Sequence, residues 1–598
     1  MNYPNIATLF WERIDRYHHR EVFYVRQQGR WVGIPWSQLG QQAHEFGCAL
    51  IADGLAPGTS VCVLMGQVPE WPISDLGTIL AGGVTVGIYP TASAEQCQYI
   101  INHSDAAFVV VDTASQLDKI LLVRHTLPRL KRIIVLDEAL ADAGADVRSF
   151  QQFLAHGRQH WQMAYPVLQQ RAASAQPDDT AIMVYTSGTT GPPKGACLSH
   201  RYIINSVESL LATIPIYDTD RSFSYLPYCH VAERIAGFYN RLYAGAPAYF
   251  VDDLTKLWTY MLEVKPTVFG SVPRFYEKIH ARIIADLEQA SGAERDQFYQ
   301  ALELGRIISR RRQARQPIPS DLQQRYQDWA QPLLSRVKDY FGGEIRITTS
   351  GGAPLPLDIA EFFDAAGIPI LQAYGLTENI CVAFNRPDNN KFGTVGPPMP
   401  GCEVKLADDG ELLVRSQMMF TGYYKDPEQT AAMFQDGWLL TGDLAEIDDE
   451  GFIKIIGRKK ELIVTSTGKN VSPMLIENML KEHPLISHAM VYGDGKSYLV
   501  ALITLNQMET EEYARSRAIP FSRFAELTQH PEIVSLVEQI VTAANKRVSS
   551  TEAIKKFVIL DHDLSIEADE ITPTLKVKRA VVARRYRALL ERLYEVSA

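Results

Sequence analysis

The stretch Tyr185-Thr-Ser-Gly-Thr-Thr-Gly-Pro-Pro-Lys-Gly195 decides how the rest of the chain is interpreted. It follows the apolar run 181–184, which predicts a buried strand, and it precedes a helical pattern. Its glycines free the backbone to expose N–H groups, and Lys194 adds a positive charge. Aligned N–H groups form a concavity that binds anions. We therefore predict that this loop binds a polyphosphate.

Hydroxyl side chains in the same loop supply further donors to a phosphate. The candidate ATP-binding residues of this stretch are Thr186, Ser187, Gly188, Thr189, Thr190, Gly191 and Lys194. The loop is not a Walker A motif, which ends in Gly-Lys-Ser/Thr, because Lys194 here precedes Gly195. The competing interpretation is a glycine- and threonine-rich turn with no ligand.

Apolar runs and helical patterns alternate on the N-terminal side of this loop. Residues 60–66 and 84–90 predict strands, and residues 68–83 and 93–104 predict helices. This alternation is typical of βαβ units with a mostly parallel sheet, so the fold class is α/β.

The remaining segments differ in their patterns. Residues 281–340 are polar and helical in pattern, and we expect an inserted helical pair there. Its run Arg310–Arg312 favours a solvated helix face over a patch that binds membranes. Short alternating strands after residue 400 predict a β-rich subdomain, and the chain after residue 460 predicts a compact α+β unit.

Length and composition exclude several classes of protein. A chain of 598 residues exceeds what one hydrophobic core supports, and its net charge of -10 disfavours nucleic acid as a partner. Seven widely spaced cysteines argue against a disulfide framework or a zinc site. The sequence contains no run of about 20 apolar residues, so we expect no membrane-spanning helix. The first residues lack a signal-peptide pattern. We expect a cytoplasmic protein. The sequence does not distinguish a monomer from a homodimer.

Four further motifs follow the phosphate loop in a fixed order. They are Tyr374–Glu378 (YGLTE), Thr441–Asp443 (TGD), Gly457–Lys460 (GRKK) and Pro573–Lys576 (PTLK). With the loop, they resemble the motifs of the adenylate-forming superfamily, which includes acyl-CoA synthetases, firefly luciferases and peptide-synthetase adenylation domains. The resemblance covers residues 8–590. It implies a large N-terminal domain of stacked α/β sheets with a β-rich subdomain (1–457), a hinge (458–460) and a small mobile α+β C-terminal domain (461–598).

The resemblance also implies a nucleotide site. Asp443 matches the carboxylate that binds both ribose hydroxyls, and Arg458 matches a ribose or phosphate contact. Glu378 and Thr186 match the Mg²⁺ site, and a carboxylate oxygen suits that hard cation. Tyr374 would lie beside adenine. The remaining residues that the resemblance places around the nucleotide are Gly351, Gly352, Ala353, Ala373, Gly375 and Thr377.

The same resemblance divides the reaction into two steps. Lys576 matches the lysine that contacts the carboxylate and the phosphate while the acyl-adenylate forms, and its ammonium would stabilise the anionic transition state. Lys460 matches the residue about which the C-terminal domain rotates. Gly468, Lys469 and Asn470 match the loop used in the CoA step.

Two stretches are similar to long-chain acyl-CoA synthetases. Residues 225–234 (YLPYCHVAER) are similar to that subfamily's LPxxHxxER pattern, and residues 269–278 (FGSVPRFYEK) resemble its acyl tunnel. His230 is a candidate gate or contact of the substrate carboxylate, and its alternative is a structural histidine. Phe269, Gly270 and Ser271 would line the acyl pocket. Asn379 departs from the family, because many relatives have threonine there, which puts fine specificity in doubt.

The resemblance therefore implies a long-chain fatty acid–CoA ligase that uses ATP, Mg²⁺ and CoA. Peripheral contact with a membrane is compatible with a fatty substrate. Three alternatives stay open at the level of sequence. An acyl-ACP synthetase would use a carrier-protein thiol, and a related ligase would act on an aryl or other bulky acid. A non-catalytic protein is disfavoured because the sequence retains Glu378, Asp443, Arg458 and Lys576. A luciferase-like protein would share the adenylation step, and it is disfavoured by the long-chain pattern at residues 225–234.

Overall fold

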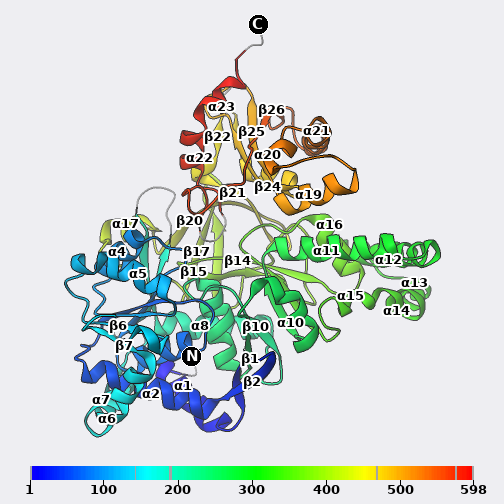
Figure 1. The fold of residues 1–598 in the computed structure, drawn as a ribbon. Helices are drawn as coiled ribbons and strands as arrows, with labels where there is room; N and C mark the ends of the chain where they lie inside the picture. Colours follow the sequence, from blue (N-terminus) through cyan, green and yellow to red (C-terminus); the bar gives the residue numbers. More distant parts are fainter. Residues whose placement is uncertain (1–2, 142, 187–191, 467–468, 573–575, 596–598) are drawn as a thin grey trace.

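The computed structural model describes residues 3–141, 143–186, 192–466, 469–572 and 576–595. Figure 1 shows a broad N-terminal part, blue to yellow-green, with a smaller C-terminal part in orange and red above it. The expected α/β fold class, with a large N-terminal and a smaller C-terminal region, is confirmed.

The largest sheet places the phosphate loop. Its strands, in spatial order, are β18 (Gly422–Tyr423), β9 (Lys194–Ser199), β8 (Thr180–Thr186), β4 (Val84–Gly87), β3 (Ser60–Leu64), β5 (Phe108–Val111), β6 (Arg132–Val135) and β7 (Val147–Ser149). The pairs from β8 to β7 are parallel, as predicted, whereas β9 runs antiparallel to β8. The loop at 187–191 therefore joins two hydrogen-bonded neighbours.

Both faces of this sheet are buried, which explains its continuous apolar runs. Val61 and Val63 of β3 face one hydrophobic cluster, and Cys62 and Leu64 face another. The helices that supply the two clusters are α2 (Trp36–Ala52), α3 (Glu70–Leu80), α6 (Phe150–Gln159), α7 (Trp161–Ser174) and α8 (His200–Thr213) on the first face, and α4 (Ala94–His103) and α5 (Ala114–Val123) on the second.

A second sheet carries several candidate nucleotide residues. It has the order β12 (Val268–Ser271), β13 (Ile347–Ser350), β14 (Ile370–Leu376) and β15 (Asn379–Phe384). The first three strands are parallel, and β15 returns antiparallel to β14. A smaller sheet has the order β10 (Ser222–Ser224), β11 (Ala248–Phe250), β1 (Glu21–Gln27) and β2 (Arg30–Pro35).

The insert predicted at 281–340 is helical. Its main elements are α11 (Pro273–Gln289), α12 (Gly292–Gln313), α13 (Ser320–Arg325), α14 (Gln331–Leu334) and α15 (Arg336–Asp339). Figure 1 shows these green helices extending away from the large sheet. Arg310 pairs with Glu361 at 2.6 Å, and Arg312 pairs with Asp364 at 3.2 Å, both on α16 (Leu357–Ala365). The arginine run therefore helps to hold the insert on the fold.

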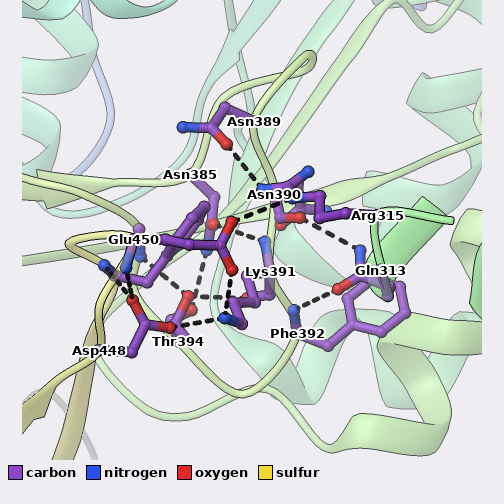
Figure 2. A network of polar contacts seen from close by, with 12 residues as sticks. Gln313, Arg315, Asn385, Asn389, Asn390, Lys391, Phe392, Thr394, Asp448 and Glu450 are labelled. Carbon is purple, nitrogen blue, oxygen red and sulfur yellow. Dashed lines mark hydrogen bonds and ion pairs between the residues drawn. The ribbon is translucent and has the colours of Figure 1, made fainter.

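The end of α12 is also tied to the β-rich sheet. Figure 2 shows Lys391 between Asp448 and Glu450, with Nζ–oxygen distances of 2.6 and 2.8 Å. Arg315 reaches Glu450 at 3.2 Å and donates to Asn389 at 2.8 Å. The acidic turn 448–451 thus connects β20 (Trp438–Ile447) and β21 (Ile453–Arg458) and also anchors the insert.

The β-rich sheet holds the ribose candidates. It consists of β16 (Cys402–Leu406), β17 (Glu411–Ser416), β20 (Trp438–Ile447) and β19 (Phe434–Gln435), and β21 (Ile453–Arg458) pairs with β20. All of these pairs are antiparallel. The β20–β21 register sets Asp443 opposite Arg458.

The C-terminal part has its own core. The antiparallel pair β24 (Ile486–Tyr492) and β25 (Leu499–Leu505) continues into β26 (Ile554–Ile559), which is parallel to β25. The helices α18 (Pro473–Lys481) and α21 (Pro531–Asn545) pack on one face, and α22 (Arg579–Arg585) and α23 (Arg587–Arg592) on the other.

Two expectations from composition can be compared with the fold. All seven cysteines are buried free thiols. Among the residues that the structure describes, none of the helices has the length and apolar character needed to span a bilayer.

Candidate active site

Asp443 lies at the centre of the candidate site. The residue is buried, and its carboxylate accepts two contacts: Arg458 Nε at 3.0 Å and the hydroxyl of Tyr374 at 2.5 Å. Burial raises the pKa of Asp443, and the Arg458 guanidinium opposes that rise. Three strands (β14, β20 and β21) thus bring together residues that lie far apart in the sequence. Tyr374 contacts Asp443 through its hydroxyl, and its place beside adenine stays a prediction.

Glu378 sits in the tight connection between β14 and β15. Tyr202 of α8 brackets this turn, because its buried hydroxyl donates to the Thr377 carbonyl and accepts from the Ile380 N–H, both at 3.0 Å. The Glu378 carbonyl accepts from the Phe420 N–H at 2.8 Å. The carboxylate accepts a hydrogen bond from the hydroxyl of Tyr423. The backbone of Glu378 is therefore fixed from two sides.

Thr186 and Lys194 mark the two ends of the phosphate loop. They are register partners, as the last residue of β8 and the first residue of β9. Lys194 Nζ donates to Gln429 Oε1 at 2.7 Å and lies over the ring of Tyr423. The loop candidates Ser187, Gly188, Thr189, Thr190 and Gly191 lie outside the described residues.

The SGGA stretch follows β13, beside the carboxyl end of β14. Ligands of parallel α/β sheets bind at such ends. Gly352 has a φ of +81°, and a Cβ added to it would meet no heavy atom within 4 Å. A Cβ added to Gly351 would lie 3.6 Å from the Ala373 carbonyl oxygen. Ala353 is exposed beside them. The three residues offer open backbone, which agrees with a predicted adenine platform without testing it.

Lys576 reaches this site from the C-terminal part. Its charge lowers the pKa of both Asp443 and His230, which places the ammonium close to both groups. Desolvation and the positive charge of Arg458 lower the pKa of Lys576 itself. The preceding residues 573–575 lie outside the described part of the chain.

His230 is a neutral imidazole at physiological pH. Desolvation, with a smaller contribution from Lys576, lowers its pKa to about 4. Its Nδ1 accepts from the Ala232 N–H at 3.1 Å. A neutral ring that accepts at Nδ1 carries its proton on Nε2, so His230 presents one N–H donor.

Buried ion pairs fix the segment that follows His230. Arg234 is fully buried, pairs with Asp75 of α3 at 2.5 Å and lies over the ring of Trp71. Glu233 pairs with Arg241 at 2.5 Å. The Glu-Arg of the LPxxHxxER-like pattern is thus structural, because it anchors the π-helix 232–239 behind His230.

The candidate acyl residues lie on β12. Phe269 is buried and stacks on Tyr225 with ring centroids 5.6 Å apart. The Tyr225 hydroxyl donates to the Gly270 carbonyl at 2.6 Å. A Cβ on Gly270 would meet Thr349 Oγ1 at 2.7 Å. The close approach of the neighbouring strand β13 therefore leaves no room for a side chain at this position. Ser271 is buried at the end of β12. A role for these residues in lining an acyl pocket stays a prediction.

The residues expected in the CoA step follow Arg458 in the chain, in a short helix and a hairpin. Lys460 is exposed in the short helix Lys459–Glu461. Lys469 and Asn470 lie in the hairpin of β22 (Ile463–Val464) and β23 (Asn470–Val471), which bonds to the turn around Lys496. Within the described residues, no hydrogen bond or ion pair joins this hairpin to Asp443 or Lys576. Gly468 lies outside the described residues.

Sequence reasoning missed the supports of the site. Tyr202, Tyr423 and Asp75 contact the predicted residues but carry no motif of their own, and they come from other segments of the chain. Asn379, which departs from the family pattern, is buried and donates to Ser416 Oγ at 2.7 Å. It therefore stabilises the turn next to Glu378. Within the described part of the chain, no cluster of histidine, cysteine or carboxylate side chains could hold a metal ion by itself.

Comparison with family models identifies the class of enzyme to which the chain belongs. The model of the AMP-binding enzyme family matches residues 10–424, and that of the AMP-binding enzyme C-terminal domain matches residues 460–598. The chain belongs to the AMP-binding enzyme family, and the resemblance carried by its motifs is confirmed.

Curated relatives and solved structures cover nearly the whole chain. The long-chain-fatty-acid–CoA ligase FadD15 of Mycobacterium bovis is 33% identical over 99% of this chain and 97% of its own length. The long-chain-fatty-acid–CoA ligase ACSBG1 of Rattus norvegicus is 32% identical over 99% and 85%. The crystal structure of the anthranilate CoA ligase AuaEII with anthranoyl-AMP has a TM-score of 0.73 and 21% identity, covering 99% of this chain and 98% of that one.

The first testable prediction concerns the turn that carries Glu378. A Cβ on Gly375 would lie 2.0 Å from the Ile380 carbonyl oxygen, so Gly375→Ala must displace the turn. We expect it to lower the free energy of unfolding by about 1–3 kcal/mol and to reduce adenylation, measured by denaturant titration and pyrophosphate exchange. Gly292→Ala is the control, because a Cβ there meets nothing within 4 Å. Wild-type exchange in Gly375→Ala would contradict the assigned geometry.

The second prediction concerns pH. The pKa of His230 is about 4 in the folded chain and about 6.5 when unfolded, so the unfolded state binds the extra proton. Stability is therefore lost as pH falls from about 6.5 to about 4, by up to about 3 kcal/mol. Urea titrations across that pH range measure the free energy of unfolding. His230→Gln should lose less stability on acidification than wild type, whereas His125→Gln, at an exposed position, should lose as much as wild type. The pKa of His200 is similarly lowered, so His200 contributes to the pH dependence of the free energy of unfolding in both variants. An unchanged slope in His230→Gln would refute the buried neutral imidazole.

Proposed function

We propose that the protein is a long-chain fatty acid–CoA ligase. It would convert a fatty acid, ATP and CoA into acyl-CoA, AMP and diphosphate through an acyl-adenylate. One observation carries the proposal: the charge of Lys576, in the C-terminal part, lowers the pKa of both Asp443 and His230 in the N-terminal part. The names of the curated relatives that match its full length support the substrate and the acceptor.

The nucleotide would be held by the strands that meet at Asp443. A carboxylate accepts hydrogen bonds from two neighbouring hydroxyl groups, which suits the ribose. Arg458 favours the ionised form of that carboxylate and so opposes the effect of burial on its pKa. The open backbone at Gly351 and Gly352 would let adenine approach closely.

A magnesium ion fits the donors beside the phosphate loop. Glu378 offers a buried carboxylate of which Tyr423 occupies one oxygen, and no described residue donates a hydrogen bond to the other. Mg²⁺ commonly binds through one or two carboxylates together with phosphates and water. When bound, the ion would neutralise charge on the phosphates. Glu378 and Thr186 would hold it.

Adenylation brings a fatty carboxylate against the α-phosphate, so two anions must approach. Lys576 would offset that charge from one side with its ammonium group. His230 would donate its Nε2–H to the substrate carboxylate and orient it. Its neutral state matters here, since a second cation would compete with Lys576 for the same oxygens.

Thioester formation needs a different arrangement. The thiol must reach the acyl carbon, and Lys576 occupies the approach when it contacts the adenylate. We propose that rotation about Lys460 withdraws Lys576 and brings the hairpin with Gly468, Lys469 and Asn470 to the site.

The alternatives differ in the acceptor or in the acid. A carrier-protein thiol would need the same first step, and an aryl acid would need a different pocket on β12. The likeness to the anthranilate CoA ligase concerns the fold alone. Holo-carrier protein and CoA, offered separately to the acyl-adenylate, would distinguish the acceptors.

A third prediction separates the two half-reactions. Lys576→Ala should lower fatty-acid-dependent pyrophosphate exchange by at least about a hundredfold, because it removes a cation from the transition state. Release of acyl-CoA from supplied acyl-adenylate should stay near the wild-type rate.

The matched control is Lys578→Ala. Lys578 lies two residues away and pairs with Asp569, so it should leave both half-reactions intact. Equal loss of both half-reactions in Lys576→Ala would contradict the division of labour.

A fourth prediction concerns the acid. Each buried methylene contributes about 0.8 kcal/mol, so kcat/KM should rise several-fold per added methylene until the pocket is filled. A panel of saturated acids from short to long chain, with benzoate for comparison, measures this. Benzoates faster than palmitate-like acids would overturn the proposed substrate class.

A further inference from the structure

Tyr423 contacts two oppositely charged side chains of the candidate site. Its hydroxyl donates to Glu378 Oε1, and the ammonium of Lys194 lies over its ring, 5.1 Å from the centroid. Tyr423 and Glu378 are both buried, with exposed fractions of 9% and 8%. We propose that Tyr423 is a positioning residue that keeps Lys194 and Glu378 from pairing and turns the free carboxylate oxygen of Glu378 toward the metal ion. This inference rests on the proposed metal role of Glu378.

The backbone around Tyr423 is hydrogen-bonded both to the strand that carries Lys194 and to the turn that carries Glu378. β18 pairs with β9, with Tyr423 opposite Ala196, and the Tyr424 N–H donates to the Gly195 carbonyl at 2.8 Å. Phe420, three residues earlier, donates its N–H to the Glu378 carbonyl at 2.8 Å. These two attachments therefore fix the position of the Tyr423 ring between Lys194 and Glu378.

The hydrogen bond of the Tyr423 N–H fixes this segment further. It donates to Thr430 Oγ1 at 2.9 Å, and Thr430 lies next to Gln429, the hydrogen-bond partner of Lys194. One short segment, residues 420–430, thus supplies neutral partners to both charged side chains.

Those neutral partners have a chemical consequence. Opposite charges attract strongly in a partly buried site of low dielectric, so a Lys194–Glu378 pair would be stable. Such a pair would occupy the groups needed by a phosphate and by its metal ion. Among the residues that the structure describes, no ion pair joins the two. Lys194 instead uses an amide oxygen and a ring face, and Glu378 uses a hydroxyl. Neither partner cancels a charge, so both charges stay available to a ligand.

Metal binding itself provides the test. The probe is Mn²⁺, titrated by electron paramagnetic resonance into full-length protein saturated with a nonhydrolysable ATP analogue. Tyr423→Phe keeps the ring under Lys194 but removes the hydroxyl, and we expect the dissociation constant of Mn²⁺ to rise about tenfold, as for one hydrogen bond to a charged group. Affinity for the nucleotide without metal should stay unchanged.

Tyr424→Phe is the matched control. Its hydroxyl donates to Asp105 at 3.0 Å, away from Glu378, so Mn²⁺ binding should match wild type. A merely structural Tyr423 would change thermal stability in Tyr423→Phe but not the Mn²⁺ constant, and that result would overturn the proposal. Glu378→Gln serves as the reference: wild-type Mn²⁺ binding there would refute the metal role of Glu378 instead.

A second pair of variants tests the separation of charges. Tyr423→Ala removes the ring, so Lys194 can reach Glu378, and Mn²⁺ binding should weaken more than in Tyr423→Phe. Adding Lys194→Gln removes the competing cation and should restore Mn²⁺ affinity to the Tyr423→Phe level. Equal constants for Tyr423→Ala with and without Lys194→Gln would overturn this part of the proposal.

Discussion

The buried carboxylate of Asp443 is the constraint on which the site depends. A buried charge needs a partner, and here the partner comes from the adjacent strand at 3.0 Å. The β20–β21 register that places Arg458 opposite Asp443 also fixes where the chain leaves the β-rich sheet. The C-terminal part follows directly from that point. The same ion pair that would hold the ribose therefore lies at the start of the segment that must carry Lys576 to it.

The site controls charge by the choice of partner for each group. Asp443 and the buried Arg234 are paired with opposite charges, and both belong to parts of the structure that need to stay fixed. His230 is kept neutral by burial. Lys194 and Glu378, which would act on the phosphates and the metal, are given neutral partners. The two groups proposed to meet phosphate and metal thus keep their charge, whereas Asp443 and Arg234 are paired.

Much of this site could be predicted from the sequence, because the family motifs are local strings. Such strings single out Thr186, Asp443 and Arg458, whose roles stay predictions, and the alternation of strands and helices predicts the parallel sheet. The supports could not be found in the same way. Tyr202 and Asp75 act through side-chain contacts between segments well over a hundred residues apart, and neither lies in a motif. The arginine run at 310–312 was predicted to be a solvated face, and the structure shows that its members also pair with α16, which no local pattern could show.

The most direct test of the account is a crystal structure with a nonhydrolysable analogue of a long-chain acyl-adenylate. The account predicts both ribose hydroxyls on the Asp443 carboxylate, Nζ of Lys576 within hydrogen-bond distance of the bridging phosphate and acyl oxygens, and Nε2 of His230 facing the acyl carbonyl. An analogue bound elsewhere, or bound at Asp443 with Lys576 and His230 both out of reach of the acyl-phosphate link, would contradict it.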